Sequence, residues 1–404
     1  MGRPCDLKSG DDPALADKGL LVEDPMRQPA CEADAPINWD ELRPWLLLSM
    51  VPGVGPLLRR DLLERFGTAE QVFAAAPAEL REVPRLGPKL CRAITTAADT
   101  IDVEAEIRRC QQHGIRIVAQ WQPHYPRALT QIPDPPAVLY QRGTLLPQDA
   151  LAVAVVGTRH ATHYGRQQTQ RIAGALARAG VTIVSGLARG IDAEAHQAAL
   201  EVGGRTIAVL GSGLLNIYPP ENKALAERIV NSGAVICESS TEAKPLPGAF
   251  PRRNRIVTGL CQGVVVVEAG DRSGALISAR LSLEQGREVF AVPGRVDSRT
   301  SHGCHRLIRD GAKLVETADD VLEELGPMFQ SAPTADGHEV HHPAELTLNE
   351  IERAVLDAIR NDPTTIDEVI EGSGLPIHRV LATISVLEMR RLVRRLSGTQ
   401  IARI

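Results

Sequence analysis

The sequence has few of the features that mark a secreted, membrane-spanning or strongly basic protein. No apolar stretch in its 404 residues approaches the roughly 20 residues needed to span a bilayer. The start, MGRPCDLKSGDD, lacks the apolar core of a secretory signal. The formal net charge of -5 excludes a protein coated in basic residues. We therefore expect a soluble, cytoplasmic protein with no membrane contact, in which any binding of nucleic acid comes from a local basic patch.

Paired cysteines and grouped metal ligands are also missing. The seven cysteines are scattered, odd in number and never in a C-x-x-C pair, which favours reduced thiols over a disulfide framework. His302 and His305 in SHGCH have no second ligand pair at zinc-finger spacing, and His338, His341 and His342 fall in a predicted linker. The sequence therefore predicts no metal and no cofactor.

The first two segments of the chain differ sharply in pattern. Residues 1–36 are rich in Asp, Pro, Ala and Gly without periodicity, which predicts a flexible extension. Residues 37–115 contain two copies of a helix-hairpin-helix pattern, LLLSMVPGVGPLLRRDLLERFG and LREVPRLGPKLCRAI. They predict a helical, SAM-like domain. Hairpin amides of this type can bind a DNA phosphate, but we favour a packing module that touches no DNA.

Residues 116–325 have the pattern of an α/β domain. Six short β-branched runs are each followed by a helical segment: LAVAVVG, VTIVSG, RTIAVLG, GAVICES, VVVVEA and REVFAVPG. Their continuous apolarity indicates strands that are buried on both faces. We predict an extended Rossmann-like, doubly wound parallel sheet. The proline-rich passage between residues 115 and 144 excludes a continuous helix and favours an extended connector laid against this domain.

The end of the chain predicts a winged helix. After a polar linker at 326–345, residues 346–404 contain three helical segments and a strand-like alternation around Ser397-Gly398. The expected apolar faces of the first and third helices are Ile351, Val355 and Ile359, and Ile377, Val380, Leu381, Ile384 and Leu387. The order of these segments is that of a winged helix-turn-helix.

Glycine and hydroxyl residues gather in the loops that follow the predicted strands. A parallel sheet binds ligands at the carboxyl ends of its strands. Glycine lets the backbone approach a ligand, and amides and hydroxyls are neutral donors for phosphate oxygens. The positions concerned are Gly157, Thr158 and Arg159, Ser185, Gly186 and Gly190, Gly211, and Ser273 and Gly274. Several such loops at one sheet edge predict an anionic ligand.

A basic segment, GAFPRRNRIVTGL, adds permanent charge to this edge. Arg252, Arg253 and Arg255 fall within one turn of a helix that is expected to begin near Pro251. Because apolar residues such as Phe250 interleave with them, some of these arginines must point into the protein or its cleft. We predict a binding role, with at least one arginine structural.

These segments together resemble the DNA-processing protein DprA (Smf) family. The resemblance is carried by GTRHATHYG, SGLARGIDAEAH, IYPPEN, FPRRNRIVTGL, VVVVEAGDRSGALISA, and REVFAVPG followed by SHGCHRLIRDGAKLV. It is dense from residue 151 to about 325, and the flanking domains also fit. It implies a single-stranded-DNA-binding recombination mediator, not an enzyme, that dimerises through the Rossmann domain. Such proteins protect incoming DNA and help to load RecA during natural transformation.

The resemblance also implies a set of DNA-binding residues. It places in the pocket Gly157, Arg159, Ser185, Gly186, Lys223, Phe250, Arg253, Asn254, Arg255, Ser273 and Gly274, to which the loop and helix patterns add Thr158, Gly190, Gly211 and Arg252. The cations would neutralise phosphates, and Phe250 would offer a ring on which a base stacks. Some family members carry a lysine a few residues before that phenylalanine. This chain has Pro247-Gly248-Ala249 there, with Lys244 as a replacement.

Two enzymatic alternatives differ in how well they fit. A dehydrogenase needs a G-x-G-x-x-G turn, whereas the first strand is followed by GTRHAT. The alternative that we retain is a nucleotide-processing enzyme of the lysine-decarboxylase-like phosphoribohydrolase type. Its Pro-Gly-Gly-x-Gly-Thr-x-x-Glu motif is absent from EAGDRSGALISA, and Glu268 has no evident partner for acid-base chemistry. Asp192 and His196, one helical turn apart, are more typical of a stabilised helix start than of catalysis.

A third possibility places the main function in the winged helix. Its late arginines, Arg390, Arg391, Arg394 and Arg395, would meet a DNA backbone, but the preceding helices are acidic. Because a recognition helix needs donors that reach base edges, we expect a protein-contact or auxiliary DNA role for this domain.

Overall fold

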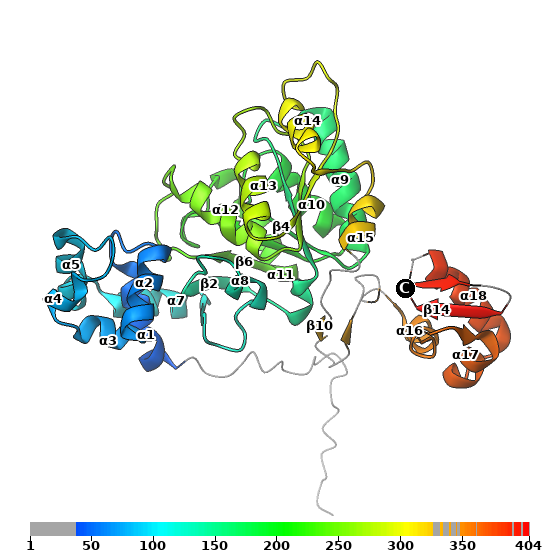
Figure 1. Cartoon of the computed structure of the whole chain (residues 1–404), viewed down its shortest axis with the longest axis horizontal. Coiled ribbons are helices and arrows are strands. Elements are labelled where there is room, and N and C mark those ends of the chain that lie inside the picture. Colours follow the sequence, from blue (N-terminus) through cyan, green and yellow to red (C-terminus); the bar gives the residue numbers. More distant parts are fainter. Residues whose placement is uncertain are drawn as a thin grey trace, which may run out of the picture. The chain divides into compact units, whose positions relative to one another are not determined.

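The computed structural model describes residues 38–325, 332–333, 339–340, 345, 348–360, 362–389, 392–396 and 399–403 (Figure 1). Several positions singled out in the sequence lie outside these residues: the extension 1–36, Cys5, Cys31, most of the predicted linker with His338, His341 and His342, and Arg390, Arg391, Ser397 and Gly398. None of the helices in the described part is long and apolar enough to cross a membrane.

The first domain is helical, as predicted. Its helices are α1 (Trp39–Met50), α2 (Pro56–Phe66), α3 (Ala69–Ala74), α4 (Pro77–Leu80), α5 (Pro88–Thr95), α6 (Ala97–Thr100) and α7 (Val103–Gln112). Both α2 and α5 begin with proline after a glycine N-cap, at Gly55-Pro56 and Gly87-Pro88. Proline suits the first helical position because its fixed φ is preorganised for a helix. The two hairpins therefore end in the same way, and the predicted tandem of helix-hairpin-helix units is confirmed.

The central domain is a nine-stranded sheet in the order β1-β2-β6-β5-β4-β3-β7-β8-β9. The six predicted strands are present as β3 (Ala152–Val156), β4 (Thr182–Ser185), β5 (Thr206–Leu210), β6 (Ala234–Cys237), β7 (Gly263–Val266) and β8 (Glu288–Ala291), and they run parallel. A short β9 (Lys313–Leu314) follows at one edge. Since β3 pairs with β4 on one side and β7 on the other, the strand order reverses beside it. Ligands bind at such a switch point in open α/β sheets.

The prediction of an extended connector between residues 115 and 144 is wrong over two strands. β1 (Arg116–Ala119) pairs with β2 (Val138–Gly143), and β2 joins the sheet antiparallel to β6, with Tyr140 opposite Cys237. The prolines of this passage lie between the two strands, where helix α8 (Arg127–Thr130) is also found. Proline blocks a ladder hydrogen bond only at its own position, so the flanking apolar runs are free to pair.

Seven helices follow the strands of this sheet: α9 (His163–Arg178), α10 (Ile191–Glu201), α11 (Lys223–Ser232), α12 (Ala249–Gly259), α13 (Ala275–Glu284), α14 (His302–Arg309) and α15 (Ala318–Leu325). Val153 and Val155 of β3 share a core with residues of α9 and α10. Ala154 and Val156 face the other way, into a core that includes residues of α12 and α13. The alternation places β3 between two helical layers, which explains its continuous apolarity. The basic helix begins at Ala249, two residues before the expected Pro251.

The last domain is a winged helix, as predicted. It contains α16 (Glu350–Asp357), β12 (Thr364–Thr365), α17 (Ile366–Ser373), α18 (Ile377–Met389), β13 (Val393–Arg395) and β14 (Gln400–Arg403), and β14 pairs with both β12 and β13. Val355, Ile359, Val380, Ile384 and Leu387 are buried. By contrast, Ile351, Ile377 and Leu381 are exposed, so the predicted apolar faces were too wide. A domain this small covers only a narrow stripe of each helix.

Two further findings concern the linker and the cysteines. The predicted linker contains a short antiparallel pair, β10 (Ala332–Pro333) and β11 (Glu339–Val340). The five cysteines in the described part, Cys91, Cys110, Cys237, Cys261 and Cys304, are free and buried.

Candidate functional site

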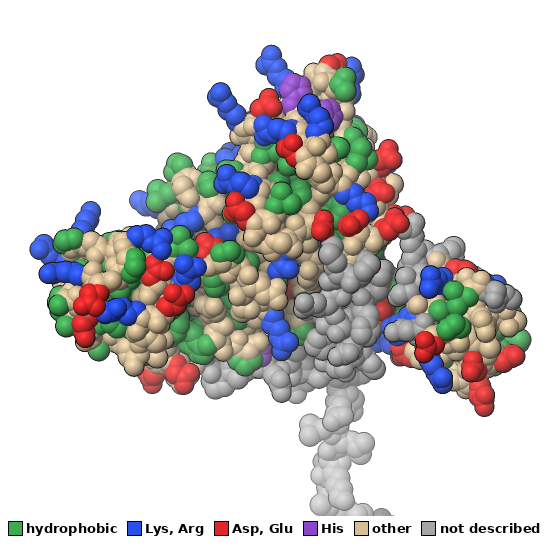
Figure 2. All heavy atoms as spheres, viewed as in Figure 1, with side chains coloured by type: hydrophobic (Ala, Val, Ile, Leu, Met, Phe, Trp, Pro, Cys, Tyr) green, Lys and Arg blue, Asp and Glu red, His purple; other side chains and the backbone are tan. Residues whose placement is uncertain are grey.

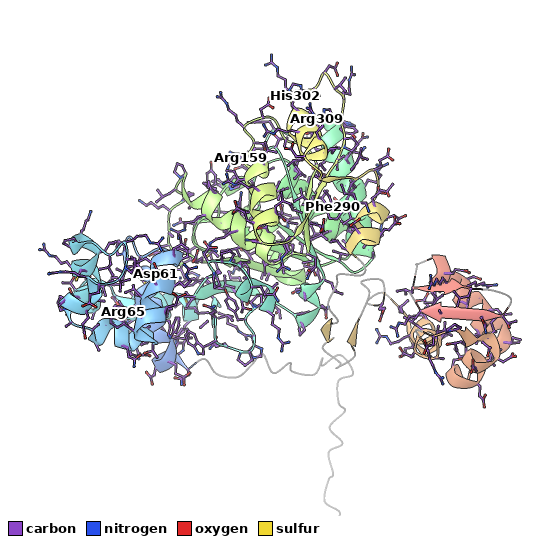
Figure 3. The ribbon with its side chains drawn as sticks, in the orientation of Figure 1. Asp61, Arg65, Arg159, Phe290, His302 and Arg309 are labelled. Atoms are coloured by element: carbon purple, nitrogen blue, oxygen red, sulfur yellow. The ribbon has the colours of Figure 1, made fainter. Side chains whose placement is uncertain are left out.

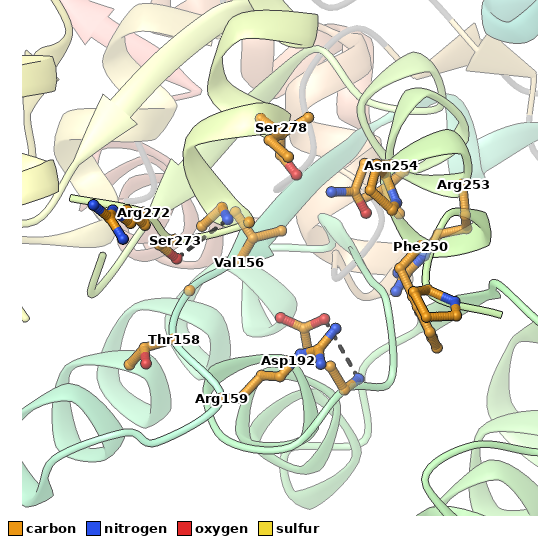
Figure 4. Close-up of a pocket in the computed structure, with 18 of the residues that line it drawn as sticks. Val156, Thr158, Arg159, Asp192, Phe250, Arg253, Asn254, Arg272, Ser273 and Ser278 are labelled. Atoms are coloured by element: carbon orange, nitrogen blue, oxygen red, sulfur yellow. Dashed lines mark hydrogen bonds between the residues drawn. The ribbon is translucent and has the colours of Figure 1, made fainter. Parts of the chain in front are cut away.

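The loops after β3 and β7 and the start of α12 enclose a pocket of about 780 Å³. It lies at the switch point of the sheet, where the sequence predicted a ligand. Of the predicted binding residues it brings together Gly157, Thr158, Arg159, Phe250, Arg253, Asn254, Ser273 and Gly274. Figure 4 shows Phe250, Arg253 and Asn254 on one side of the pocket and Arg272 and Ser273 on the other. A smaller adjoining hollow adds Gly186.

Arg253 is a buried cation in the pocket wall. Its residue surface is only 7% exposed, and its Nε atom has no hydrogen-bond partner in the described part of the chain. Burial lowers the pKa of Arg253 to about 10, with Asp192 opposing and Arg159 adding to the change. At neutral pH the guanidinium therefore stays charged. A buried positive charge with an unused donor favours an anionic ligand at this position.

An aromatic pair lines the pocket beside this charge. The rings of Tyr218 and Phe250 are 5.7 Å apart between centroids. The Arg159 guanidinium carbon lies 5.4 Å from the centroid of Phe250, and that of Arg189 lies 5.9 Å from the centroid of Tyr218. Both distances are in the range of a cation–π contact. The arrangement offers two apolar rings, tilted by 50° to each other and flanked by guanidinium groups, which suits a nucleobase and its phosphates.

The arginines of α12 have separate roles in the structure. Arg252 is exposed, whereas Arg253 enters the pocket. Arg255 is buried and forms ion pairs with Glu238 at 2.8 Å and Asp134 at 2.9 Å. Since the structure does not bring Arg255 into the pocket, it is the structural arginine that the sequence led us to expect.

Six predicted residues lie outside both hollows: Arg255, described above, and Ser185, Gly190, Gly211, Lys223 and Arg252. The Ser185 hydroxyl donates to the Val155 carbonyl, so it is used within the sheet. Gly190 has a φ of 76° and passes close to the carbonyl of Thr158, a position that only glycine tolerates well. At Gly211 a Cβ atom would stand 3.0 Å from Cδ1 of Phe250, so this glycine leaves room for the ring. Lys223 and Arg252 are exposed outside the pocket lining.

Asp192 and His196 serve the fold around the site. Asp192 accepts hydrogen bonds from the backbone N–H groups of Gly186 at 3.2 Å and Ala188 at 3.4 Å. Burial raises its pKa, while Arg253 opposes the change. His196 is buried with Nδ1 2.6 Å from the Thr206 hydroxyl, and burial lowers its pKa to about 3. Asp192 thus holds the loop 186–188 beside Arg253. His196 is a neutral core residue.

Glu268, the candidate base of the enzymatic alternative, is fully engaged. It is 2% exposed and accepts hydrogen bonds from the Thr162 amide and hydroxyl at 2.9 and 2.6 Å and from the Thr300 hydroxyl at 3.2 Å. A general base must be free to reach a proton of the substrate. In the described part of the chain, no three His, Cys, Asp or Glu side chains are grouped as a metal site requires.

Among the lining residues that sequence reasoning did not predict for the pocket are His160, Tyr218, Arg272 and Ser278. The signal for Arg272 was present, because it directly precedes the predicted Ser273. Tyr218 stood in the quoted segment IYPPEN, but nothing in the sequence places it against Phe250. Such a pairing needs a loop and a helix from separate parts of the chain.

The helical domain contacts the sheet domain through a buried charge cluster next to α12. Arg59 of α2 lies 3.6 Å from Glu238, the carboxylate that also pairs with Arg255. Burial lowers the pKa of Arg59, and Glu238 opposes the change. The exposed Arg60 donates to the carbonyl of Pro133 at 3.1 Å. The arginines after the first hairpin are thus used in packing, which supports our interpretation of this domain as a packing module.

Comparison with known proteins gives matches along most of the chain. The model of the family "DNA recombination-mediator protein A" matches residues 116–326. A "DprA winged helix domain" matches residues 339–399, and a "SAM-like Helix-hairpin-helix tandem" matches residues 46–100. The three matches follow the order of the domains described above.

Individual relatives agree with these matches. Protein Smf of Synechocystis sp. is 36% identical over 389 residues, which cover 89% of this chain and 98% of the relative. The DNA processing protein DprA of Streptococcus pneumoniae is 46% identical over 201 residues, which cover 50% of this chain and 71% of the relative. The X-ray structure of DprA from S. pneumoniae matches with a TM-score of 0.62 and 35% identity, covering 72% of this chain and 99% of that one.

Proposed function

This chain belongs to the DNA recombination-mediator protein A family, the DprA or Smf proteins, and we propose that it binds single-stranded DNA in the pocket at the switch point of its sheet. The observation that carries the proposal is the buried, charged Arg253 beside the Tyr218–Phe250 ring pair. Proteins that bind single strands combine cations for the backbone with aromatic rings for the bases. The pocket supplies both, from the start of α12 and from the loop that carries Tyr218.

The wider role follows from the same assignment. We propose that the protein acts as a recombination mediator, protects incoming DNA, helps to load RecA during natural transformation, and dimerises through its sheet domain in the cytoplasm. We propose that it performs no chemistry on the strand, which is supported by the engagement of Glu268, the candidate base, with Thr162 and Thr300. The domain boundaries at 115/116 and 345/346 stay predictions.

Binding is expected to be sensitive to salt and independent of the winged helix. With a labelled single-stranded oligonucleotide, fluorescence anisotropy should show the logarithm of the affinity falling linearly with the logarithm of salt concentration. The expected slope is about -0.7 per phosphate contacted. A variant that ends at residue 340 should bind with similar affinity, because the pocket lies wholly within the sheet domain. Loss of all single-strand binding in this variant would contradict the assignment.

Gly186→Ala is expected to disable the pocket. A Cβ atom at this position would overlap the guanidinium of Arg253, whereas the φ of Gly186 is outside the left-handed region and suits alanine. Displacing the guanidinium should lower the affinity for single-stranded DNA about tenfold or more, the order of one charged hydrogen bond. Gly248→Ala is the matched control, since a Cβ there meets no atom within 4 Å. Equal affinities of the two variants would show that Arg253 is not displaced or is not used.

A further inference from the structure

One exposed aromatic ring outside the pocket stands on a rigid support. Tyr164, in the first turn of α9, is 41% exposed. Its hydroxyl donates a hydrogen bond to the Pro293 carbonyl at 2.6 Å, and a Cβ atom at Gly294 would stand 3.9 Å from its ring. The ring is therefore held against the loop 293–301 instead of swinging freely. A fixed, exposed ring is a surface on which a base can stack.

Glu268 holds this loop next to the loop that enters the pocket. It accepts hydrogen bonds from Thr162, at the end of the loop 157–162, and from Thr300, in the loop 293–301. The backbone adds a second connection through the chain after β7, because the Ala269 N–H donates to the Thr300 carbonyl at 2.7 Å and the Thr158 N–H donates to the Glu268 carbonyl at 2.8 Å. Gly157, Thr158, Arg159 and His160 of the first loop line the pocket. The Tyr164 ring thus has a fixed position beside one end of the pocket.

The loop 293–301 also presents an available positive charge. Arg295 is paired with Asp297, whereas Arg299 is exposed and has no ion-pair partner in the part of the chain that the structure describes. A Cβ atom at Gly270 of the pocket wall would stand 3.4 Å from the Arg299 carbonyl, so this arginine belongs to the rim. Figure 2 shows cationic side chains and a histidine at this end of the domain, and Figure 3 labels His302 and Arg309 there, beyond Arg159.

We propose that a strand bound in the pocket continues over this rim, where one base stacks on Tyr164 and Arg299 contacts a backbone phosphate. The inference rests on the proposed function. A pocket of about 780 Å³ is of the size that holds one drug-sized ligand. For comparison, single-strand sites on OB folds cover about 4–16 nucleotides, and a strand of that length has to continue beyond a pocket of this size. The fixed ring and available cation on the rim provide the next contacts.

The test compares a short oligothymidylate of about 5 nucleotides with one of about 15, lengths that span the usual range of single-strand sites. In the full-length protein, the longer strand should bind more tightly. Tyr164→Ala and Arg299→Ala should each lower the affinity for the longer strand, the former by about tenfold, the order of one stacked base. The shorter strand should bind unchanged. Arg299→Ala should also reduce the salt slope for the longer strand by about 0.7.

Control variants separate a contact from a structural effect. Tyr164→Phe keeps the ring and loses only the hydroxyl bond to Pro293, so it should bind the longer strand more tightly than Tyr164→Ala does, with a loss smaller than that from removing the ring. Arg178→Ala, at the far end of α9, removes an exposed charge away from the pocket and should have little effect.

A cross-linking experiment tests the contact directly. When 5-iodouracil is placed in the longer strand, it should cross-link to the peptide that contains Tyr164.

The outcomes distinguish this inference from the proposed function. If the wild type binds neither strand, the proposed function itself fails. If it binds both with the same affinity, or if Tyr164→Ala and Arg299→Ala leave the longer strand unaffected, only the extended path is overturned. The same holds if Tyr164→Phe is as defective as Tyr164→Ala, because the hydroxyl bond would then account for the effect.

Discussion

The double variant Arg159→Ala/Arg253→Ala is expected to lower the affinity for single-stranded DNA by about 100-fold or more. Hydrogen bonds to charged groups contribute about 1.5–3 kcal/mol each, and about 1.4 kcal/mol corresponds to a factor of ten. Arg253 should contribute the larger share, since it is buried in the pocket wall. Arg159 is exposed and lies over Phe250, so its loss should also loosen the stacking surface. Fluorescence anisotropy on a labelled oligonucleotide measures the change.

The matched control is Arg178→Ala/Arg228→Ala, which removes two exposed charges from α9 and α11 outside the pocket lining. It should leave the affinity within a few-fold of the wild type, so that a change in net charge alone is excluded as the cause. An Arg159→Ala/Arg253→Ala protein that is folded by circular dichroism and binds with unchanged affinity would refute the proposed pocket.

Glu238→Ala is expected to destabilise the protein by about 3–5 kcal/mol. This is the usual cost of removing one partner from a buried ion pair, because the opposite charge remains buried without compensation. Glu238 is 8% exposed at its side chain and faces Arg59 and Arg255, each 4% exposed. Its loss would leave Arg59 buried without its carboxylate and Arg255 with Asp134 alone, at the contact of the helical domain with α12. Denaturant unfolding followed by circular dichroism measures the free energy of unfolding.

Glu227→Ala provides the comparison for this prediction. Glu227 forms two hydrogen bonds with Arg142 at 2.7 and 2.8 Å, but its side chain is 55% exposed. Exposed pairs of this kind contribute about 0–1 kcal/mol. Similar losses of stability for the two variants would show that the buried cluster does not hold the domains together. Because α12 carries both Arg253, which lines the pocket, and Arg255, which pairs with Glu238, weaker DNA binding by folded Glu238→Ala protein is also expected.

The strand-rich domain was readable from the sequence because its signal is local. The run from Leu151 to Gly157 is apolar throughout, which identifies a strand covered on both faces without knowledge of its neighbours. The glycine loops that follow such strands must meet at one edge, since parallel strands share their direction. For the same reason the hairpins at Gly55-Pro56 and Gly87-Pro88 were recognisable. The two antiparallel strands β1 and β2 were not predicted from the sequence, because the prolines between them obscured their short apolar runs.

The sequence by itself therefore determined the order of the domains, the edge of the sheet that carries the site, and the residue types gathered there. It did not determine which arginine of α12 lines the pocket, which is exposed and which is structural. Arg252, Arg253 and Arg255 are near neighbours in one helix, yet one is exposed, one lines the pocket and one is locked to Glu238 and Asp134. The exposure and the partners of each arginine depend on carboxylates and glycines from distant segments, such as Glu238 and Gly186. Only tertiary packing brings those groups within reach, and the cost of burying an unpaired charge then assigns each side chain its partner.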